Sequence, residues 1–272
     1  MGRRKLALSA LLIWLWPAAW LVALQLVSVE QEIEIGKEAQ AQVREQVPEL
    51  RDAEIAEYVR DLGAALVAHA PGPEYPYSFS VANYKELNAF ALPGGPVWVN
   101  RGIIRAAGNE SQLVGVLAHE IAHIAERHAA DQITKSVVAN GLLGLLDSVL
   151  GDDRPAQVAR IGSGLFAEGL FLKFSRDDER AADRVGLEIM REAGWNPRGM
   201  VEFMQTLRDA QGRDPGAVEV FLSTHPTPEG RIEELTSQTK GSADGRRDSR
   251  RFQQIRARLD RLPPAATMNT SG

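Results

Sequence analysis

The spacing of apolar and polar residues predicts a chain made mostly of helices, with one short region of strands. Residues 31–46 and 53–68 are typical of helices, and a break rich in proline follows them. Residues 77–83 alternate as a strand does, and residues 88–100 favour a hairpin around Pro93-Gly94-Gly95-Pro96. These patterns predict a helix-rich α+β fold with a small sheet.

Further helices are expected in the second half of the chain. Asn109 can cap a helix that has Gln112 at its N3 position, and its apolar residues recur at helical spacing: Leu113, Val116, Leu117, Ile121 and Ile124. A later helix ends at Gly194, and Asn196-Pro197 begins the next one. Residues 250–262 form a basic amphipathic segment whose apolar side holds Phe252, Ile255, Leu259 and Leu262.

The N-terminal segment differs from the rest of the chain. Arg3, Arg4 and Lys5 precede residues 6–29, which carry no charge. As a helix this run would be about 36 Å long, enough to cross a hydrocarbon core of about 30 Å. The basic cluster would keep the N-terminus in the cytoplasm and the body exported, on the periplasmic side of the inner membrane. We expect residues 1–29 to be a signal anchor, and the alternative is a signal peptide whose cleavage releases the body.

The composition narrows the classes of function. The chain has no cysteine, which excludes disulfides, a thiol nucleophile, a cysteine-ligated zinc and a lipoprotein anchor. The formal charge is −5 despite the basic N-terminus, and an acidic body argues against a nucleic-acid partner. The length after the N-terminal segment fits one domain over residues 30–262, and residues 263–272 are expected to be a disordered tail.

The strongest chemical signal is the run Ala118-His119-Glu120-Ile121-Ala122-His123. In a helix, His119 and His123 lie one turn apart on nearly the same side, so both can bind one metal ion. Glu120 lies on the neighbouring flank, where it can reach a water held by that metal. The alternative is a surface helix with two unrelated histidines. It is disfavoured because three of the five histidines fall within ten consecutive positions.

A catalytic zinc usually has three protein ligands, so a third is needed. Glu179 and Asp183 lie four residues apart in a second predicted helix, where one can bind metal and the other can accept the second ring N–H of a ligand histidine. The alternative is a solvated acidic helix start. His128 lies nine residues after His119, on the opposite side of a regular helix, and is expected to face solvent.

Four ordered motifs resemble the HtpX-like and BepA-like zinc metallopeptidases, gluzincins related to the CAAX prenyl protease and the mitochondrial Oma proteases. They are Asn88-Ala89-Phe90-Ala91-Leu92-Pro93-Gly94-Gly95, the His119–His123 motif, Glu179 with Ala182-Asp183, and Ser223-Thr224-His225-Pro226 followed by Arg231. The resemblance implies a zincin-like domain with its small sheet next to the motif helix. It also implies one zinc ion bound by His119, His123 and Glu179, with Glu120 as the base and Asp183 supporting the site.

The local sequence around His225 indicates only an extended loop before Pro226 and a helix start at Thr227-Pro228. The resemblance associates the matching histidine with the metal site. His225 then either fills the open zinc position in a resting form or hydrogen-bonds to the developing oxyanion, together with Arg231.

The resemblance implies a zinc metalloendopeptidase that hydrolyses exported or membrane-associated, misfolded polypeptides in protein quality control. An extended substrate can add to a strand edge, so the candidate substrate-binding residues are Asn88, Ala89, Phe90 and Ala91. The alternative, which is compatible with this, is that the strands supply core residues, namely Phe90, Leu92, Val97 and Val99. Apolar segments 137–150 and 161–174 are expected to cover the site. The alternative function is a membrane-tethered chaperone or assembly factor with a structural or latent zinc site. We find no 34-residue repeat, so partner docking through a repeat domain is not expected.

Overall fold

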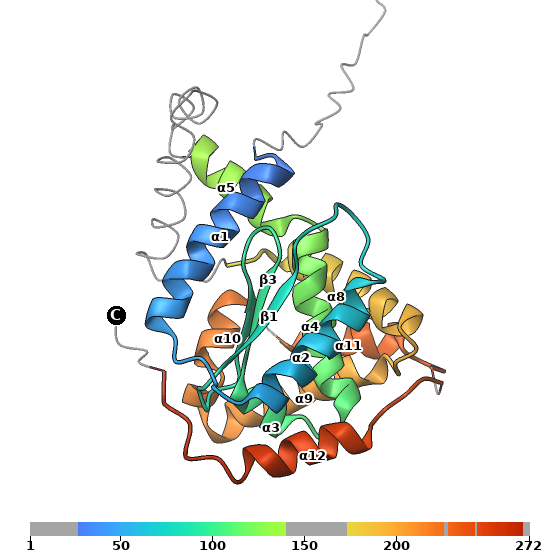
Figure 1. The fold of residues 1–272 in the computed structure, drawn as a ribbon. Coiled ribbons are helices and arrows are strands. Elements are labelled where there is room, and N and C mark those ends of the chain that lie inside the picture. The colour runs from blue at the N-terminus through green and yellow to red at the C-terminus, as the bar shows by residue number, and fades with distance from the viewer. Residues whose placement is uncertain (1–26, 140–172, 226–227, 243, 269–272) are drawn as a thin grey trace, which may run out of the picture.

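The computed structural model describes residues 27–139, 173–225, 228–242 and 244–268, in which helices surround a small sheet (Figure 1). Helices of the N-terminal half are α1 (Val29–Gln46), α2 (Ala53–Val67), α3 (Arg101–Ala106), α4 (Glu110–Ala125) and α5 (His128–Ala139). Those that follow are α8 (Arg176–Glu192), α9 (Arg198–Arg213), the 3₁₀ turn η1 (Pro215–Ala217), α10 (Glu219–Thr224), α11 (Pro228–Gln238) and α12 (Arg250–Leu259). The helix-rich α+β class predicted from the sequence is confirmed.

The sheet has three strands in the order β1-β3-β2, formed by β1 (Ser78–Ala82), β2 (Ala89–Ala91) and β3 (Pro96–Asn100). β2 and β3 are antiparallel, which confirms the predicted hairpin. β1 and β3 run parallel, a pairing that the local sequence did not indicate. Gly94 has a φ of +69° in the turn between β2 and β3, and its Cα lies against the backbone of α1, where a Cβ would meet Ile33 Cα at 2.5 Å.

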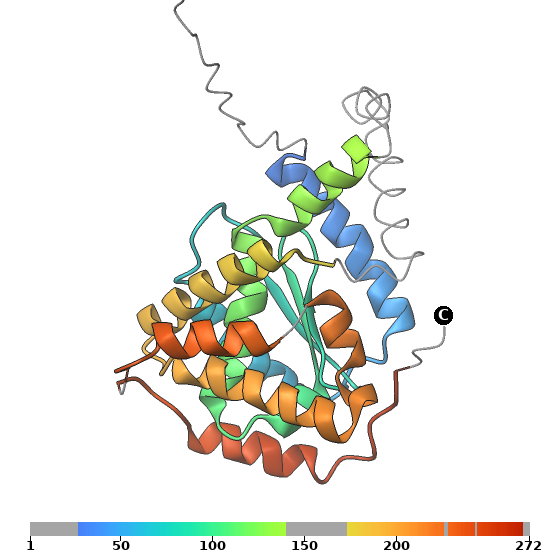
Figure 2. The same cartoon turned by 180° about the vertical axis from the view of Figure 1, so that it is seen from behind.

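Helix α4 is the central element, because every one of its residues is buried. It begins where the Asn109 side chain accepts a hydrogen bond from the Gln112 backbone N–H, as predicted. The sheet and α2 lie on one side of α4, whereas α8 and α9 cover the other, with α11 beside α9 (Figures 1 and 2). α9 approaches closely because Gly115 has no side chain: a Cβ there would lie 2.7 Å from Met200 Cα. A buried helix of this kind positions side chains firmly.

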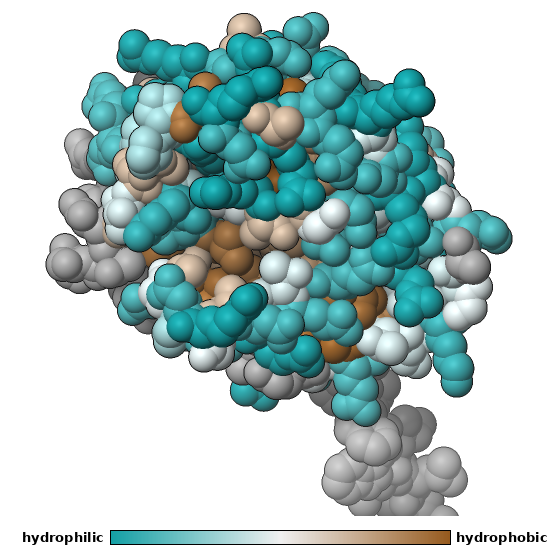
Figure 3. All heavy atoms as spheres, turned by 90° about the horizontal axis from the view of Figure 1, so that it is seen from below, coloured by the Kyte–Doolittle hydropathy of each residue, from teal (hydrophilic) through white to brown (hydrophobic). Residues whose placement is uncertain are grey.

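The C-terminal helix α12 packs its apolar side onto the body. Phe252, Ile255 and Leu259 are buried, and the face of the molecule on which α12 lies is mainly hydrophilic (Figure 3). Residues 263–268, expected to belong to a disordered tail, instead continue along the body. Ala266 exchanges backbone hydrogen bonds with Asn83 and Lys85, and Arg101 donates to the carbonyl of Pro263. Because these contacts are made with distant parts of the chain, the local composition of residues 263–268 did not predict that they would lie along the body.

Two expectations fall on residues outside the described ranges. The proposed anchor or signal peptide lies almost wholly within residues 1–26, and most of the two apolar cover segments lies within residues 140–172. Among the helices that the structure describes, none combines the length and the hydropathy needed to cross a bilayer.

Candidate metal centre

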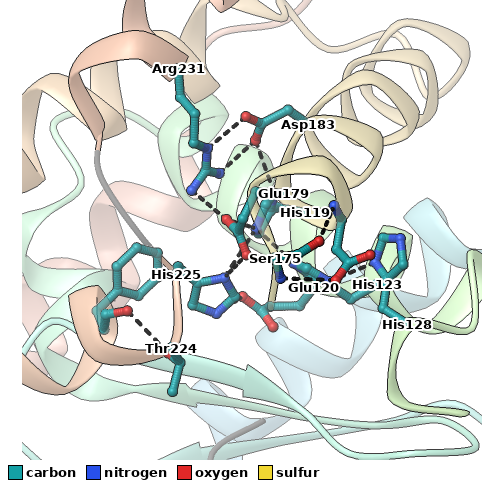
Figure 4. A network of polar contacts seen from close by, with 12 residues as sticks. His119, Glu120, His123, His128, Ser175, Glu179, Asp183, Thr224, His225 and Arg231 are labelled. Carbon is teal, nitrogen blue, oxygen red and sulfur yellow. Dashed lines mark hydrogen bonds and ion pairs between the residues drawn. The ribbon is translucent and has the colours of Figure 1, made fainter. Parts of the chain in front are cut away.

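Four buried side chains from three separate segments converge on one point behind the sheet. His119 and His123 come from α4, Glu179 comes from α8, and His225 directly follows α10 (Figure 4). One potential ligand atom from each side chain lies within 4.8 Å of all the others. The structure therefore brings together the three expected ligands and His225, which the resemblance also associated with the metal site.

The distances show that the potential ligand atoms face one another. The Nε2 atoms of His119 and His123 are 3.0 Å apart, and they lie 3.5 Å and 3.4 Å from the two carboxylate oxygens of Glu179. His225 Nδ1 lies 2.8 Å from Glu179 Oε1 and 3.4 Å from His119 Nε2. Two imidazoles with a carboxylate are a ligand set that zinc uses in catalytic sites. The residues present therefore fit a zinc ion, and a fourth donor lies beside them.

The start of α8 explains how Glu179 reaches this position. Ser175 and Asp178 form a reciprocal capping box, which fixes the first turn of the helix. Asp177 in that turn is 93% exposed, as an acidic helix start would be, whereas the Glu179 side chain is 1% exposed. Glu179 and Asp183 share the buried side of α8. The solvated alternative therefore describes Asp177 and not the two candidate residues.

A second group of charges lies behind the ligands. Asp183 Oδ1 is 3.1 Å from His119 Nδ1, on the ring edge away from the cluster. Arg231 donates from Nε and Nη2 to the two oxygens of Asp183, and its Nη1 contacts Glu179. Burial alone would raise the pKa of Asp183, but the charge and hydrogen bonds of Arg231, together with His119, outweigh burial and lower the pKa to about 2. Asp183 is thus an ionised acceptor at neutral pH.

The guanidinium of Arg231 is engaged by two carboxylates on the far side of the ligands. This differs from the expectation that Arg231 takes part with His225 in binding an oxyanion. The carboxylates raise the pKa of Arg231 although burial opposes them. Its contacts fit a residue that positions Asp183 and Glu179, and sequence spacing alone could not distinguish the two roles.

The environment of Glu120 is unusual for a carboxylate. Its side chain is fully buried, and neither oxygen has a hydrogen-bond partner among the described residues. His225 Nε2 lies 3.6 Å from Glu120 Oε1. Burial raises the pKa of Glu120 above its ordinary value, against the lowering effect of the histidines. A buried carboxylate with unused acceptors beside a ligand cluster is suited to taking and returning a proton.

The two motif histidines differ in their protonation chemistry. Burial would lower the pKa of His119, but hydrogen bonds to Asp183 and Glu179 outweigh it and raise the pKa to about 9. Burial holds the pKa of His123 well below its ordinary value.

The ring of Phe174 stacks on His123, with centroids 3.9 Å apart. Phe174 is the last residue of a segment expected to cover the site. Its contact with His123 was not singled out from the sequence, where the one local indication was an aromatic residue directly before the Ser175 cap.

The expectation that His128 faces solvent is wrong. α4 ends at Ala125, and Arg127 adopts a left-handed φ of +61°, so the backbone turns before α5 begins at His128. The His128 ring is buried, and its Nδ1 lies 2.9 Å from Nδ1 of His123 (Figure 4). Counting 100° per residue failed because residues 119 to 128 do not form one continuous helix.

The four candidate substrate-binding residues lie at the sheet edge formed by β2, next to α4. Ala89 and Phe90 are buried, and Phe90 stacks on Trp98 at 6.2 Å, so these side chains belong to the core. Asn88 is also buried, and neither polar atom of its amide has a hydrogen-bond partner among the described residues. Phe90 is therefore a core residue, as the alternative expected, and β2 also lies at an edge of the sheet.

Comparison with known proteins agrees with this arrangement. Residues 49–239 match the model of a family described as peptidase family M48. The chain is 32% identical over 211 residues to the beta-barrel assembly-enhancing protease of Escherichia coli (strain K12), covering 76% of this chain and 43% of that protein. It is 36% identical over 148 residues to the mitochondrial metalloendopeptidase OMA1 of Schizosaccharomyces pombe, covering 54% and 42%. The chain thus spans less than half the length of these relatives.

Proposed function

We propose, from the premise that this chain belongs to peptidase family M48 and has the site of a metalloendopeptidase, that it is a zinc-dependent endopeptidase. In this proposal His119, His123 and Glu179 bind the ion, and Glu120 is the general base. The observation that carries the proposal is the convergence of three buried donors beside a carboxylate whose oxygens have no hydrogen-bond partner among the described residues. Such a carboxylate is unfavourable in a purely structural site, where nothing uses it.

A bound zinc ion would supply Lewis acidity, which lowers the pKa of water and polarises a peptide carbonyl. Glu120 takes a proton from the attacking water and then passes it to the leaving amine. The carboxylate of Asp183 lies 3.1 Å from Nδ1 of His119 and orients its ring, and Arg231 keeps the carboxylates of Asp183 and Glu179 in place. The result is hydrolysis of an internal peptide bond.

We propose that the substrate lies extended along the sheet edge at β2, with Asn88, Ala89, Phe90 and Ala91 as the binding segment. In this arrangement the substrate backbone would form hydrogen bonds with the exposed strand edge. Such bonds select extended chains with little preference for their sequence. The position of β2 at one edge of the sheet and next to α4 supports this. Unfolded polypeptides are the substrate class that such recognition favours.

The N-terminal sequence and the relatives support a proposal for the cellular setting. The uncharged run after Arg3, Arg4 and Lys5 favours an inner-membrane anchor or a cleaved signal, with the body on the periplasmic side. One relative is named for enhancing β-barrel assembly. We propose that the substrates are misfolded exported or membrane-associated proteins.

We further propose that His225 is the fourth donor in a resting form of the site. Its Nδ1 lies beside Glu179 and His119, and Phe221 stacks on its ring at 4.7 Å. Substrate entry then requires His225 to leave, which makes the resting enzyme weakly active.

The test compares Glu120→Gln with Glu126→Gln, a matched change at an exposed position six residues further along. Zinc content and casein hydrolysis are measured on each purified full-length protein. Glu120→Gln should keep zinc and lose hydrolysis by a factor of about 10² to 10⁴, and Glu126→Gln should resemble the wild type. His119→Ala and Glu179→Ala should lose the metal. Full cellular function of Glu120→Gln would instead support the chaperone alternative.

A further inference from the structure

We propose that His128 is the positioning residue for the ligand His123, whose ring it orients by accepting a hydrogen bond from Nδ1–H. The two Nδ1 atoms are 2.9 Å apart, and both rings are buried. This contact lies on the opposite side of His123 from the ligand cluster, since Nε2 of His123 faces His119 and Glu179. Metal-binding histidines need such a partner because it fixes the tautomer and the ring orientation.

The positions of the protons follow from the geometry. A cation takes the lone pair of His123 Nε2, so the ring proton of His123 must be on Nδ1. Two Nδ1 atoms at 2.9 Å share one proton, which means that His128 accepts it. The proton of His128 is therefore on Nε2. The pair has one consistent arrangement once the metal is bound.

The fold fixes His128 by contacts outside the metal centre. The turn at Arg127 carries the positive φ, and Arg127 donates from Nε to Glu32 and from Nη2 to the carbonyl of Val27. Glu32 is buried and also accepts from the hydroxyl of Tyr75. A left-handed arginine is unfavourable unless surrounding contacts impose it. The N-terminal end of α1 therefore holds the turn that aims His128 at His123.

The two ligand histidines are held by different chemistry. His119 faces the ionised carboxylate of Asp183, whereas His123 faces a neutral imidazole. The cluster already contains the carboxylates of Glu120, Glu179 and Asp183 against one guanidinium. The imidazole of His128 orients His123 without adding another buried negative charge. A further buried carboxylate would be costly beside the three already present. Phe174 closes the arrangement by stacking on His123, with its centroid 6.0 Å from that of His128.

The experiment compares His128→Asn with His128→Leu, two side chains of similar size. Asn offers an acceptor near the position of Nδ1, and Leu offers none. Zinc affinity is measured by chelator competition on the full chain, together with the visible spectrum of the Co²⁺ form and the thermal midpoint of the metal-free protein. His128→Leu should weaken zinc binding by about 10- to 100-fold and alter the Co²⁺ spectrum. His128→Asn should restore both.

The same pair of substitutions at His69, which lies outside the cluster and pairs with Glu192, is the control and should leave zinc affinity unchanged. Wild-type affinity in His128→Leu would overturn the proposal, and so would equal weakening by Asn and Leu at equal metal-free stability. If His128→Leu does not fold, nitrogen NMR of the zinc-loaded wild type decides: His128 protonated on Nε2 alone supports the proposal, and a proton on its Nδ1 overturns it.

This inference rests on the proposed metal site, but the two fail differently. A wild-type protein that binds no zinc contradicts the proposed function. A wild type that binds zinc tightly, together with a His128→Leu variant of equal affinity, contradicts only the role of His128.

Discussion

Arg231 donates two parallel hydrogen bonds to Asp183, at 2.7 Å from Nε and 2.6 Å from Nη2. Both side chains are buried, and Asp183 in turn lies 3.1 Å from the ring of His119. A two-pronged pair of this kind fixes direction as well as distance. The orientation of the first motif histidine therefore depends on an arginine 112 positions later in the sequence, from a different helix.

Replacing Arg231 should destabilise the fold even without metal. Arg231→Met leaves the carboxylates of Asp183 and Glu179 buried without their cation, so the free energy of unfolding should fall by about 3–5 kcal/mol. Arg180→Met is the control, because Arg180 is half exposed and should matter by less than about 1 kcal/mol. Urea unfolding of the metal-free proteins measures both. Equal losses would mean that the buried pair has no special role.

Removing the fourth donor should activate the enzyme. If His225 occupies the cluster in the resting form, His225→Ala should raise casein hydrolysis severalfold while zinc content stays the same. His69→Ala serves as the matched control. Loss of hydrolysis with zinc retained would instead assign His225 to the oxyanion, the other role considered from the sequence.

The close contact between α4 and α9 should not tolerate a methyl group. Gly115→Ala would place Cβ 2.7 Å from the backbone of Met200, so the helices must separate, at a cost of about 1–3 kcal/mol. Gly212→Ala is a matched change in α9, where no atom lies within 4 Å of the added Cβ. It should raise stability by up to about 1 kcal/mol through helix propensity. In thermal unfolding, the midpoint of Gly115→Ala should fall and that of Gly212→Ala should rise. Midpoints that move in the same direction would contradict the packing argument.

Asp52 should make stability depend on acid pH. Burial would raise its pKa, but hydrogen bonds from Arg258 and the backbone of Ile55 outweigh burial and lower the pKa. A lowered folded pKa means that the stabilisation is complete above the unfolded pKa of about 3.9 and is lost as the pH falls below it.

Asp52→Asn keeps an acceptor for the helix cap but removes the charge that Arg258 binds. At pH 7 it should cost about 1 kcal/mol, since Arg258 is partly exposed. The difference from the wild type should shrink in urea unfolding at pH 3. A difference that is the same at pH 7 and pH 3 would rule out the carboxylate charge as its source.

Features that depend on neighbouring residues were predictable from the sequence. The caps at Asn109 and Gly194 and the hairpin around Gly94 were found because turn and cap residues act locally. The position of Glu179 beside the histidines was also expected, because a zinc pair requires a third ligand. Each of these predictions used either the spacing of a few neighbouring residues or the usual number of protein ligands of a catalytic zinc.

The features that were missed depend on contacts between distant segments. The solvent-facing prediction for His128 assumed a continuous helix, but the turn at Arg127 is imposed by Glu32 and by the carbonyl of Val27. Residues 263–268 were expected to be disordered, and they pair with a segment near Asn83. No local pattern contains such information, because each partner lies about a hundred or more residues away.

The donors of the metal centre are spread over 106 positions, from His119 to His225. During synthesis the two motif histidines emerge long before Glu179 and His225 exist, so a nascent chain offers only part of the coordination sphere. Tight binding of an ion at the proposed site therefore requires the folded chain and comes late in maturation. The ions present where the chain completes its folding, and not those around the ribosome, would then decide which ion the proposed site binds.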